Sequence, residues 1–127
     1  MVIFECLLID IAPTISRLLN IPMTPPTGKP IPEVLKYTKK KDYKRMVIIV
    51  VEGLRYFLYI HLFQIMKNLN ELVKKGLLFK CKSPATITSP AIASIFTGYP
   101  PEEHKYFQQL IFMLKGQKTL KIQNLKA

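Results

Sequence analysis

The feature that most constrains this chain is a continuous apolar run at residues 46–51, MVIIVV, which ends at Glu52 and Gly53. A β-branched run without polar alternation is typical of a strand covered by helices on both faces, as in a parallel sheet. Apolar side chains at helical spacing follow over about residues 61–75, and Gly76 stands where a helix stop is expected. Because residues 77–81 can form the next strand, the pattern predicts a βαβ unit in an α/β fold, a parallel sheet with flanking helices.

The segments on either side of this unit have simpler patterns. Residues 10–20 predict a helix with Asp10 as its N-cap, and the proline-dense stretch 21–32 predicts an extended loop. The apolar amino terminus predicts buried structure, and residues 90–96 predict a short helix that begins right after Thr88. Residues 108–127 mix an apolar helical patch with a Lys- and Gln-rich tail that we expect to fray.

Composition limits the class of protein. A length of 127 residues allows one small domain, and a hydrophobic content of 49% is that of a folding chain. The net charge of +11 favours phosphates or acidic surfaces as ligands. However, the basic residues are dispersed, and neither an RNP motif nor a zinc finger is present, so a solvated basic surface is the simpler interpretation.

The cysteines and the apolar segments bear on the compartment. Cys6 and Cys81 are too few and too far apart in sequence for a metal cluster or a disulfide framework, so a reduced, cytoplasmic setting is expected. Residues 46–66 are long enough to span a membrane, but they contain Glu52 and Arg55. Each central charge costs roughly 2.5–3.5 kcal/mol on insertion scales, so a soluble strand and helix explain the segment better, and we expect no transmembrane segment.

Two residues could carry chemistry. Glu52 follows the predicted strand directly, and a carboxylate at the carboxyl end of a parallel strand is well placed to hold a metal ion. Thr88 lies at a helix start, where unpaired N–H groups and the helix dipole favour a bound phosphate and a nucleophilic hydroxyl. Each also has a structural interpretation, because Glu52 could face solvent or pair with Arg55, and Thr88 or Ser89 could be an N-cap.

Several motifs occur in the order found in one enzyme family. These are MVIIVVEGLR at 46–55, NLNELVKKGLLF at 68–79, TSPAIASIFTGYP at 88–100, and Glu103-His104. Together they resemble the type I phosphodiesterase and nucleotide pyrophosphatase branch of the alkaline phosphatase superfamily. The resemblance implies that Glu52 takes the place of a metal-binding Asp and that Thr88 takes the place of the nucleophile. It also implies a divalent metal, zinc or manganese, and a phosphodiester or nucleotide substrate.

The opening of the chain resembles the far end of the same family. Residues 10–22 and 28–31 look like the helix and loop that close these enzymes, so the family's two ends occur in swapped order. This predicts three segments. Residues 1–45 contain the terminal helix and loop with a basic linker, 46–107 form the nucleophile-bearing βαβα region, and 108–127 are a tail.

The chain departs from the family pattern in several places. Glu52 replaces an Asp, Phe57 stands near the place of another, Ala91 replaces an Asn that helps to hold phosphate, and Lys105 replaces a Gly. The long middle section that supplies most metal ligands is missing, and the only histidines are His61 and His104, neither in a ligand motif. A second copy would lack the same ligands.

The sequence therefore predicts a fragment of a metal-dependent phosphodiesterase or pyrophosphatase-like hydrolase, inactive or nearly so alone, whose missing ligands a partner chain could supply. Two other classes stay open. One is a small basic α/β module that binds anions, nucleic acid or a partner protein, recognisable by steeply salt-dependent binding without metal. The other is a peripheral membrane protein, which lipid flotation would reveal.

Overall fold

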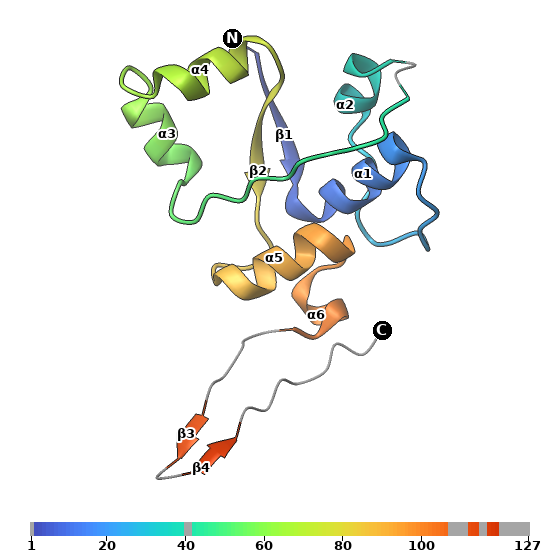
Figure 1. The fold of residues 1–127 in the computed structure, drawn as a ribbon, viewed down its shortest axis with the longest axis vertical. Helices are drawn as coiled ribbons and strands as arrows, with labels where there is room; N and C mark the ends of the chain where they lie inside the picture. The colour runs from blue at the N-terminus through green and yellow to red at the C-terminus, as the bar shows by residue number, and fades with distance from the viewer. Residues whose placement is uncertain (1, 40–41, 107–111, 115–116, 120–127) are drawn as a thin grey trace.

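The computed structural model describes residues 2–39, 42–106, 112–114 and 117–119. In chain order its elements are β1 (Ile3–Leu7), the 3-10 helix η1 (Leu8–Asp10), α1 (Ile11–Leu19), α2 (Pro32–Tyr37), α3 (Tyr56–Leu62), α4 (Lys67–Lys74), β2 (Leu78–Lys82), α5 (Thr88–Thr97), α6 (Pro101–His104), β3 (Phe112–Leu114) and β4 (Gln117–Thr119). Figure 1 shows β1 and β2 side by side, with α3 and α4 on one side, α1 and α2 on the other, and α5 and α6 at one end.

A parallel two-stranded sheet confirms the expected α/β class. Strands β1 and β2 pair in register from Ile3 opposite Leu78 to Leu7 opposite Lys82. The Phe4 and Phe79 rings, opposite each other in this register, stack with centroids 5.3 Å apart. The expected strand at 77–81 is confirmed with a shift of one residue, but its partner is the amino-terminal strand.

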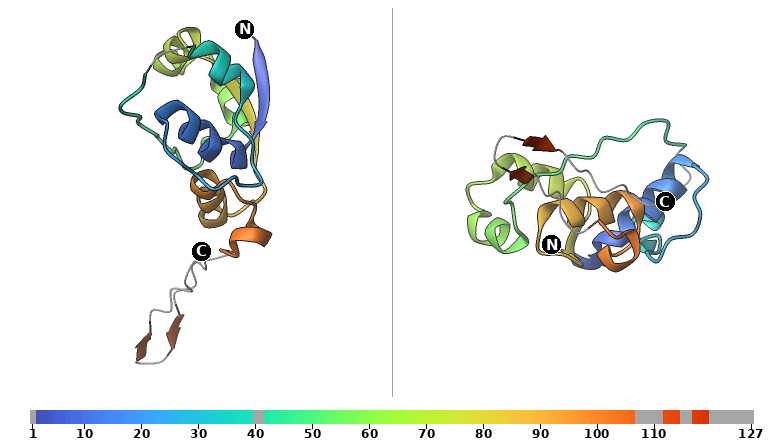
Figure 2. Two further views of the ribbon diagram at one scale, coloured as in Figure 1. Left: turned by 90° about the vertical axis from the view of Figure 1, so that its right-hand side faces the viewer. Right: turned by 90° about the horizontal axis from the view of Figure 1, so that it is seen from below.

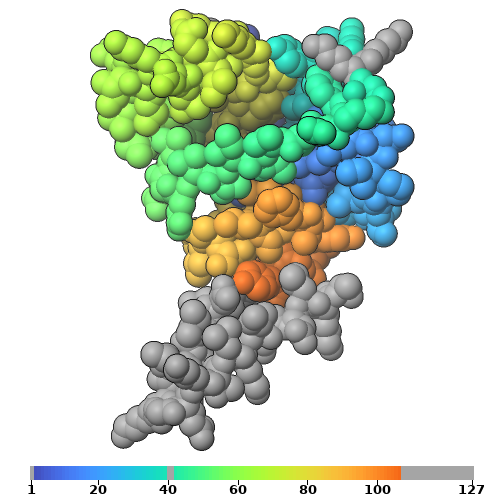
Figure 3. Space-filling view, viewed as in Figure 1, coloured from blue at the N-terminus to red at the C-terminus, as the bar shows by residue number. Residues whose placement is uncertain are grey.

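The prediction of a buried strand at residues 46–51 is wrong. The segment is extended but belongs to no strand, and its side chains are exposed, Val47 at 83% and Ile49 at 80%. Figure 3 shows it as part of a green band across the front of the molecule, between the yellow-green α3 and α4 and the orange α5. An extended segment becomes a strand only when a neighbouring segment pairs with its backbone N–H and C=O groups. Within the described residues the strand that pairs with β2 is β1, and residues 46–51 do not take that place.

The single helix expected over about 61–75 is two helices, α3 and α4. Asn70 stabilises the break between them, because its amide nitrogen donates to the Phe63 carbonyl at 2.6 Å and its amide oxygen accepts from the Tyr59 hydroxyl at 2.9 Å. The expected end of the helix is confirmed, since α4 ends at Lys74, just before Gly76.

The helix predicted over 10–20 is confirmed as α1, with Asp10 as N-cap and Asn20 left-handed at its end (φ +52°). The Asp10 carboxylate does not bond to α1 itself. It accepts the N–H groups of Leu7 at 3.0 Å and Lys29 at 2.9 Å. Asp10 therefore ties β1 and the proline-rich loop to the start of the helix.

The core lies where η1, α1 and the loop before α2 meet α5, and it contains the buried Ile9, Ala12, Ile31 and Ile95. The loop itself was predicted, whereas α2 was not. Figure 2 shows from two further directions that α1 lies beside the sheet and α5 at one end of it. Within the residues described, no helix is both long and apolar enough to cross a membrane.

The segment after His104 differs from the expected apolar helical patch. Phe112–Leu114 and Gln117–Thr119 form an antiparallel pair, with Phe112 opposite Thr119. The rest of the predicted tail, residues 108–111, 115–116 and 120–127, lies outside the described residues.

Candidate functional site

The two candidate residues meet in space although they are far apart in the sequence. The Thr88 hydroxyl donates a hydrogen bond to Glu52 Oε1 at 3.1 Å. Glu52 reaches this position from a turn in which Gly53 has a left-handed backbone (φ +79°), a conformation that glycine adopts without steric cost. Both side chains are exposed, so water and small solutes can reach them.

Thr88 is the first residue of α5, and Ile87 is the N-cap. Thr88 is therefore not the N-cap of α5, and its hydroxyl bonds to Glu52 rather than to the helix. The N–H groups of Thr88 and Ser89 are in the first turn, where no helical carbonyl can accept them. A helix start of this kind favours a negatively charged group such as a phosphate.

Helix α5 is held firmly at its other end. Gly98 ends it with a left-handed backbone (φ +74°), and Ser94, fully buried, bonds to His104 Nε2 at 3.1 Å. His104 Nδ1 accepts the Tyr106 N–H at 3.0 Å, so the ring proton is on Nε2 and is donated to Ser94. The sequence did not reveal this pair, because its residues are ten apart in two short helices.

The remaining metal-ligand candidates do not join Glu52. His104 is used in the core, and His61 Nδ1 lies 2.9 Å from the Phe57 carbonyl of its own helix. Among the described residues no group of three His, Cys, Asp or Glu side chains could hold a metal ion, and no ion pair joins Glu52 to Arg55. Glu52 alone is too small a donor set for a divalent ion that needs several ligands.

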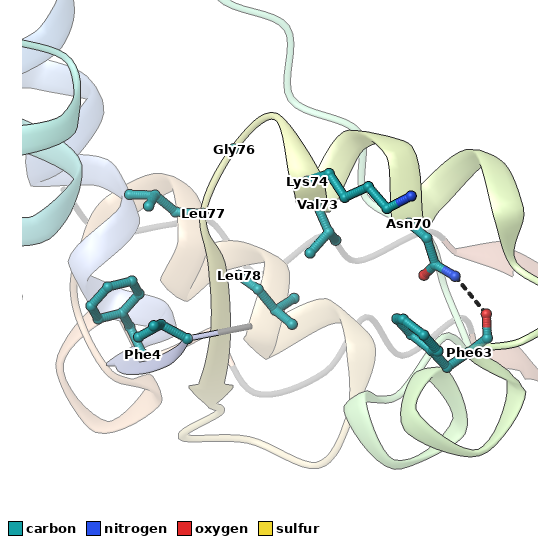
Figure 4. A pocket seen from close by; sticks show the side chains of 9 residues that line it. Phe4, Phe63, Asn70, Val73, Lys74, Gly76, Leu77 and Leu78 are labelled. Atoms are coloured by element: carbon teal, nitrogen blue, oxygen red, sulfur yellow. Dashed lines mark hydrogen bonds between the residues drawn. The ribbon is translucent and has the colours of Figure 1, made fainter.

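An apolar hollow lies elsewhere, between α4 and the sheet. Its volume is about 540 Å³, and Figure 4 shows Phe4, Phe63, Val73 and Leu78 among its lining side chains. Its two polar side chains each have a partner: the Asn70 amide bonds to the Phe63 carbonyl, and Lys74 pairs with Glu71 at 2.7 Å. The lining of the hollow is mostly apolar, and neither Glu52 nor Thr88 is part of it.

Comparison with family models gives one match over residues 46–125, described as type I phosphodiesterase / nucleotide pyrophosphatase. This match covers more than half of the chain and includes both Glu52 and Thr88. The chain belongs to the type I phosphodiesterase/nucleotide pyrophosphatase family. No curated protein and no solved structure matches it.

The segment outside the family match packs against the matched block. Thr27 donates to the Glu103 carboxylate at 2.7 Å, and the Gly28 N–H donates to the Gly98 carbonyl at 2.9 Å. Helix α1 also contacts α5. The elements before residue 46 therefore support the family helix that carries Thr88.

Proposed function

We propose that this chain is the nucleophile-bearing part of a phosphodiesterase or nucleotide pyrophosphatase and that it is inactive, or nearly so, by itself. The observation that supports this most is the 3.1 Å hydrogen bond between Thr88 and Glu52, which joins two motifs 36 residues apart inside the family match. In this proposal Thr88 is the nucleophile toward a phosphodiester or pyrophosphate phosphorus. Its place at the start of α5 sets a phosphate against unpaired N–H groups.

The family implies a divalent metal, zinc or manganese, but the described residues do not fit such a centre. Glu52 supplies one carboxylate, and in the part of the chain that the structure describes it belongs to no group of three His, Cys, Asp or Glu side chains that could hold an ion. Without a metal the Thr88 hydroxyl stays protonated near neutral pH and is a weak nucleophile, because a carboxylate such as Glu52 is too weak a base to ionise an alcohol. The role of Glu52 is therefore that of a single metal ligand in a site completed by other residues.

A partner polypeptide that carries the missing ligands would complete the site. The extended segment 46–51 supports this part of the proposal, because its side chains are exposed and it belongs to no strand. Unpaired backbone with apolar side chains is a template for strand addition. In this proposal the supporting segment is residues 1–45, the nucleophile region is 46–107 and the tail is 108–127. The assembled protein is cytoplasmic. No feature of the described residues favours the alternative of a small basic interaction module.

Hydrolysis of a chromogenic phosphodiester tests the proposed inactivity. The purified chain should be no faster than Thr88→Ala, with or without zinc or manganese. Addition of a polypeptide that carries the family's other metal-binding section should produce a rate that Thr88→Ala abolishes. A metal-dependent rate in the isolated chain that disappears in both Thr88→Ala and Glu52→Ala would contradict the proposal, because it would require ligands within this chain.

Phosphate binding tests the site itself. Without metal, the Glu52 carboxylate next to Thr88 repels a phosphate, so Glu52→Gln should bind a nucleoside monophosphate several-fold more tightly. In an NMR titration the largest shifts should fall on the amides of Thr88 and Ser89. Glu102→Gln, which also removes one exposed carboxylate but on α6, is the matched control and should leave the affinity unchanged. Equal affinities of the wild type and Glu52→Gln for the nucleoside monophosphate would show that Glu52 is not part of the phosphate site.

A further inference from the structure

The chain's two cysteines, 75 positions apart in sequence, are opposite each other in the sheet. Cys6 of β1 and Cys81 of β2 are register partners in neighbouring parallel strands. Side chains directly opposite in a sheet point to the same face, as the stacked rings of Phe4 and Phe79 show two residues earlier. The fold therefore brings together two cysteines whose separation in sequence argued against a disulfide framework.

Their spacing suits a covalent bond. Neighbouring strands lie about 4.7–4.9 Å apart, and a disulfide needs a Cα separation of about 4.4–6.8 Å. Both thiols are free in this structure, and Cys6 is half-buried whereas Cys81 is exposed. An oxidant in solution can therefore reach Cys81 first, with Cys6 directly beside it.

We propose that Cys6 and Cys81 form a reversible oxidation site, in which peroxide converts the two thiols into a disulfide that joins β1 to β2. This proposal is independent of the proposed phosphodiesterase function, because Cys81 is on β2 and neither Glu52 nor Thr88 takes part.

The environment assigns a different task to each sulfur. The hydrogen bond with Cys6 lowers the pKa of the Cys81 thiol, whereas the same bond, followed by burial, raises the pKa of Cys6 well above its usual range. Thiolate is the reactive form toward peroxide. Cys81 is therefore the attacking sulfur and Cys6 the resolving one.

The chemistry balances in two steps. The Cys81 thiolate attacks one oxygen of hydrogen peroxide, so that an S–O bond forms, the O–O bond breaks, and the departing hydroxide leaves as water after taking a proton. The Cys6 sulfur then attacks the sulfur of the resulting sulfenic acid, forming the S–S bond, while the S–O bond breaks and the proton of Cys6 leaves with a second water. Two electrons pass from the two sulfurs to one peroxide.

Mass spectrometry of the full chain after peroxide treatment tests the proposal. The wild type should lose two hydrogen atoms in mass, lose both free thiols, and remain monomeric on a non-reducing gel, and dithiothreitol should restore both thiols. Cys6→Ser should instead stop at a sulfenic acid on Cys81 that dimedone labels. Cys81→Ser should react more slowly than Cys6→Ser, because the remaining Cys6 thiol is half-buried, which hinders peroxide and disfavours the thiolate, whereas Cys81 is exposed.

Unfolding provides a control for proximity. In concentrated urea the two cysteines are separated by a long flexible loop, so the rate of internal disulfide formation should be at least about tenfold lower than in the folded chain. Oxidation of wild-type Cys81 to sulfinic acid with Cys6 still free would overturn the proposal. Disulfide-linked dimers in place of the internal bond, or equal rates of disulfide formation with and without urea, would overturn it as well.

Discussion

Substitution of Gly28 by alanine should strongly destabilise the fold. A Cβ on Gly28 would lie 2.5 Å from the carbonyl carbon of Ile9 and closer still to its oxygen. Carbon atoms pack favourably at about 3.5–4.0 Å, so the loop would have to move by about 1 Å from η1. That movement also strains the 2.9 Å hydrogen bond from the Gly28 N–H to the Gly98 carbonyl. The clash is with backbone, so no side-chain rotation relieves it.

The expected magnitude follows from these two terms. Overpacking costs typically about 1–3 kcal/mol, and loss of a backbone hydrogen bond adds about 0.5–1.5 kcal/mol. We expect the free energy of unfolding to fall by about 3 kcal/mol, which lowers Tm by roughly 10–20 °C for a chain of this size. Thermal unfolding followed by circular dichroism measures this change.

Two other glycines are matched controls. A Cβ on Gly76 would meet only the Leu72 carbonyl oxygen at 3.4 Å, an ordinary contact, so Gly76→Ala should change the free energy of unfolding by less than about 0.5 kcal/mol. Gly53 has open space but a φ of +79°, so Gly53→Ala should cost about 1–2 kcal/mol through its backbone alone. If Gly28→Ala unfolds within two or so degrees of the wild type, or of Gly76→Ala, the proline-rich loop does not dock on η1 and α5 as described.

Three further substitutions or treatments test other parts of the fold. Ser94→Ala should lower the free energy of unfolding in urea by about 1–3 kcal/mol, because it leaves the buried Nε2 proton of His104 without an acceptor. Ser83→Ala, at an exposed position, is the control, and equal stabilities of the two variants would contradict this role of Ser94. Ile49→Lys should change the free energy of unfolding by less than about 0.5 kcal/mol and improve solubility, since Ile49 is 80% exposed. A loss of several kcal/mol would show that residues 46–51 form a buried strand. Peroxide-oxidised wild type should unfold at a higher temperature, because closing a loop of about 75 residues contributes at most about 4.5 kcal/mol of chain entropy. A similar rise in oxidised Cys6→Ser would refute the internal disulfide.

Much of the local structure follows from the sequence alone. Helix α1 begins at Ile11, because Asp10 before it is a capping residue and Pro13 suits a first turn. The prolines of 21–31 exclude regular structure there. Helix α5 was expected to begin at Pro90 and begins at Thr88 instead, with Gly98 at its end. The motifs of the family match also depend only on residue order, so Glu52 and Thr88 could be selected as candidates before their distance was known.

Tertiary structure decided which segments became neighbours. The run at 46–51 has the composition of a central strand, yet β1 pairs with β2, because strand formation needs a partner for the backbone and local composition does not choose it. The break between α3 and α4 depends on Asn70, whose amide contacts two other turns of chain. The bonds between Thr88 and Glu52 and between Ser94 and His104, and the opposition of Cys6 and Cys81, likewise join residues that sequence spacing keeps apart. Sequence patterns report the one-dimensional periodicity of each element, whereas these contacts depend on how the elements pack in three dimensions.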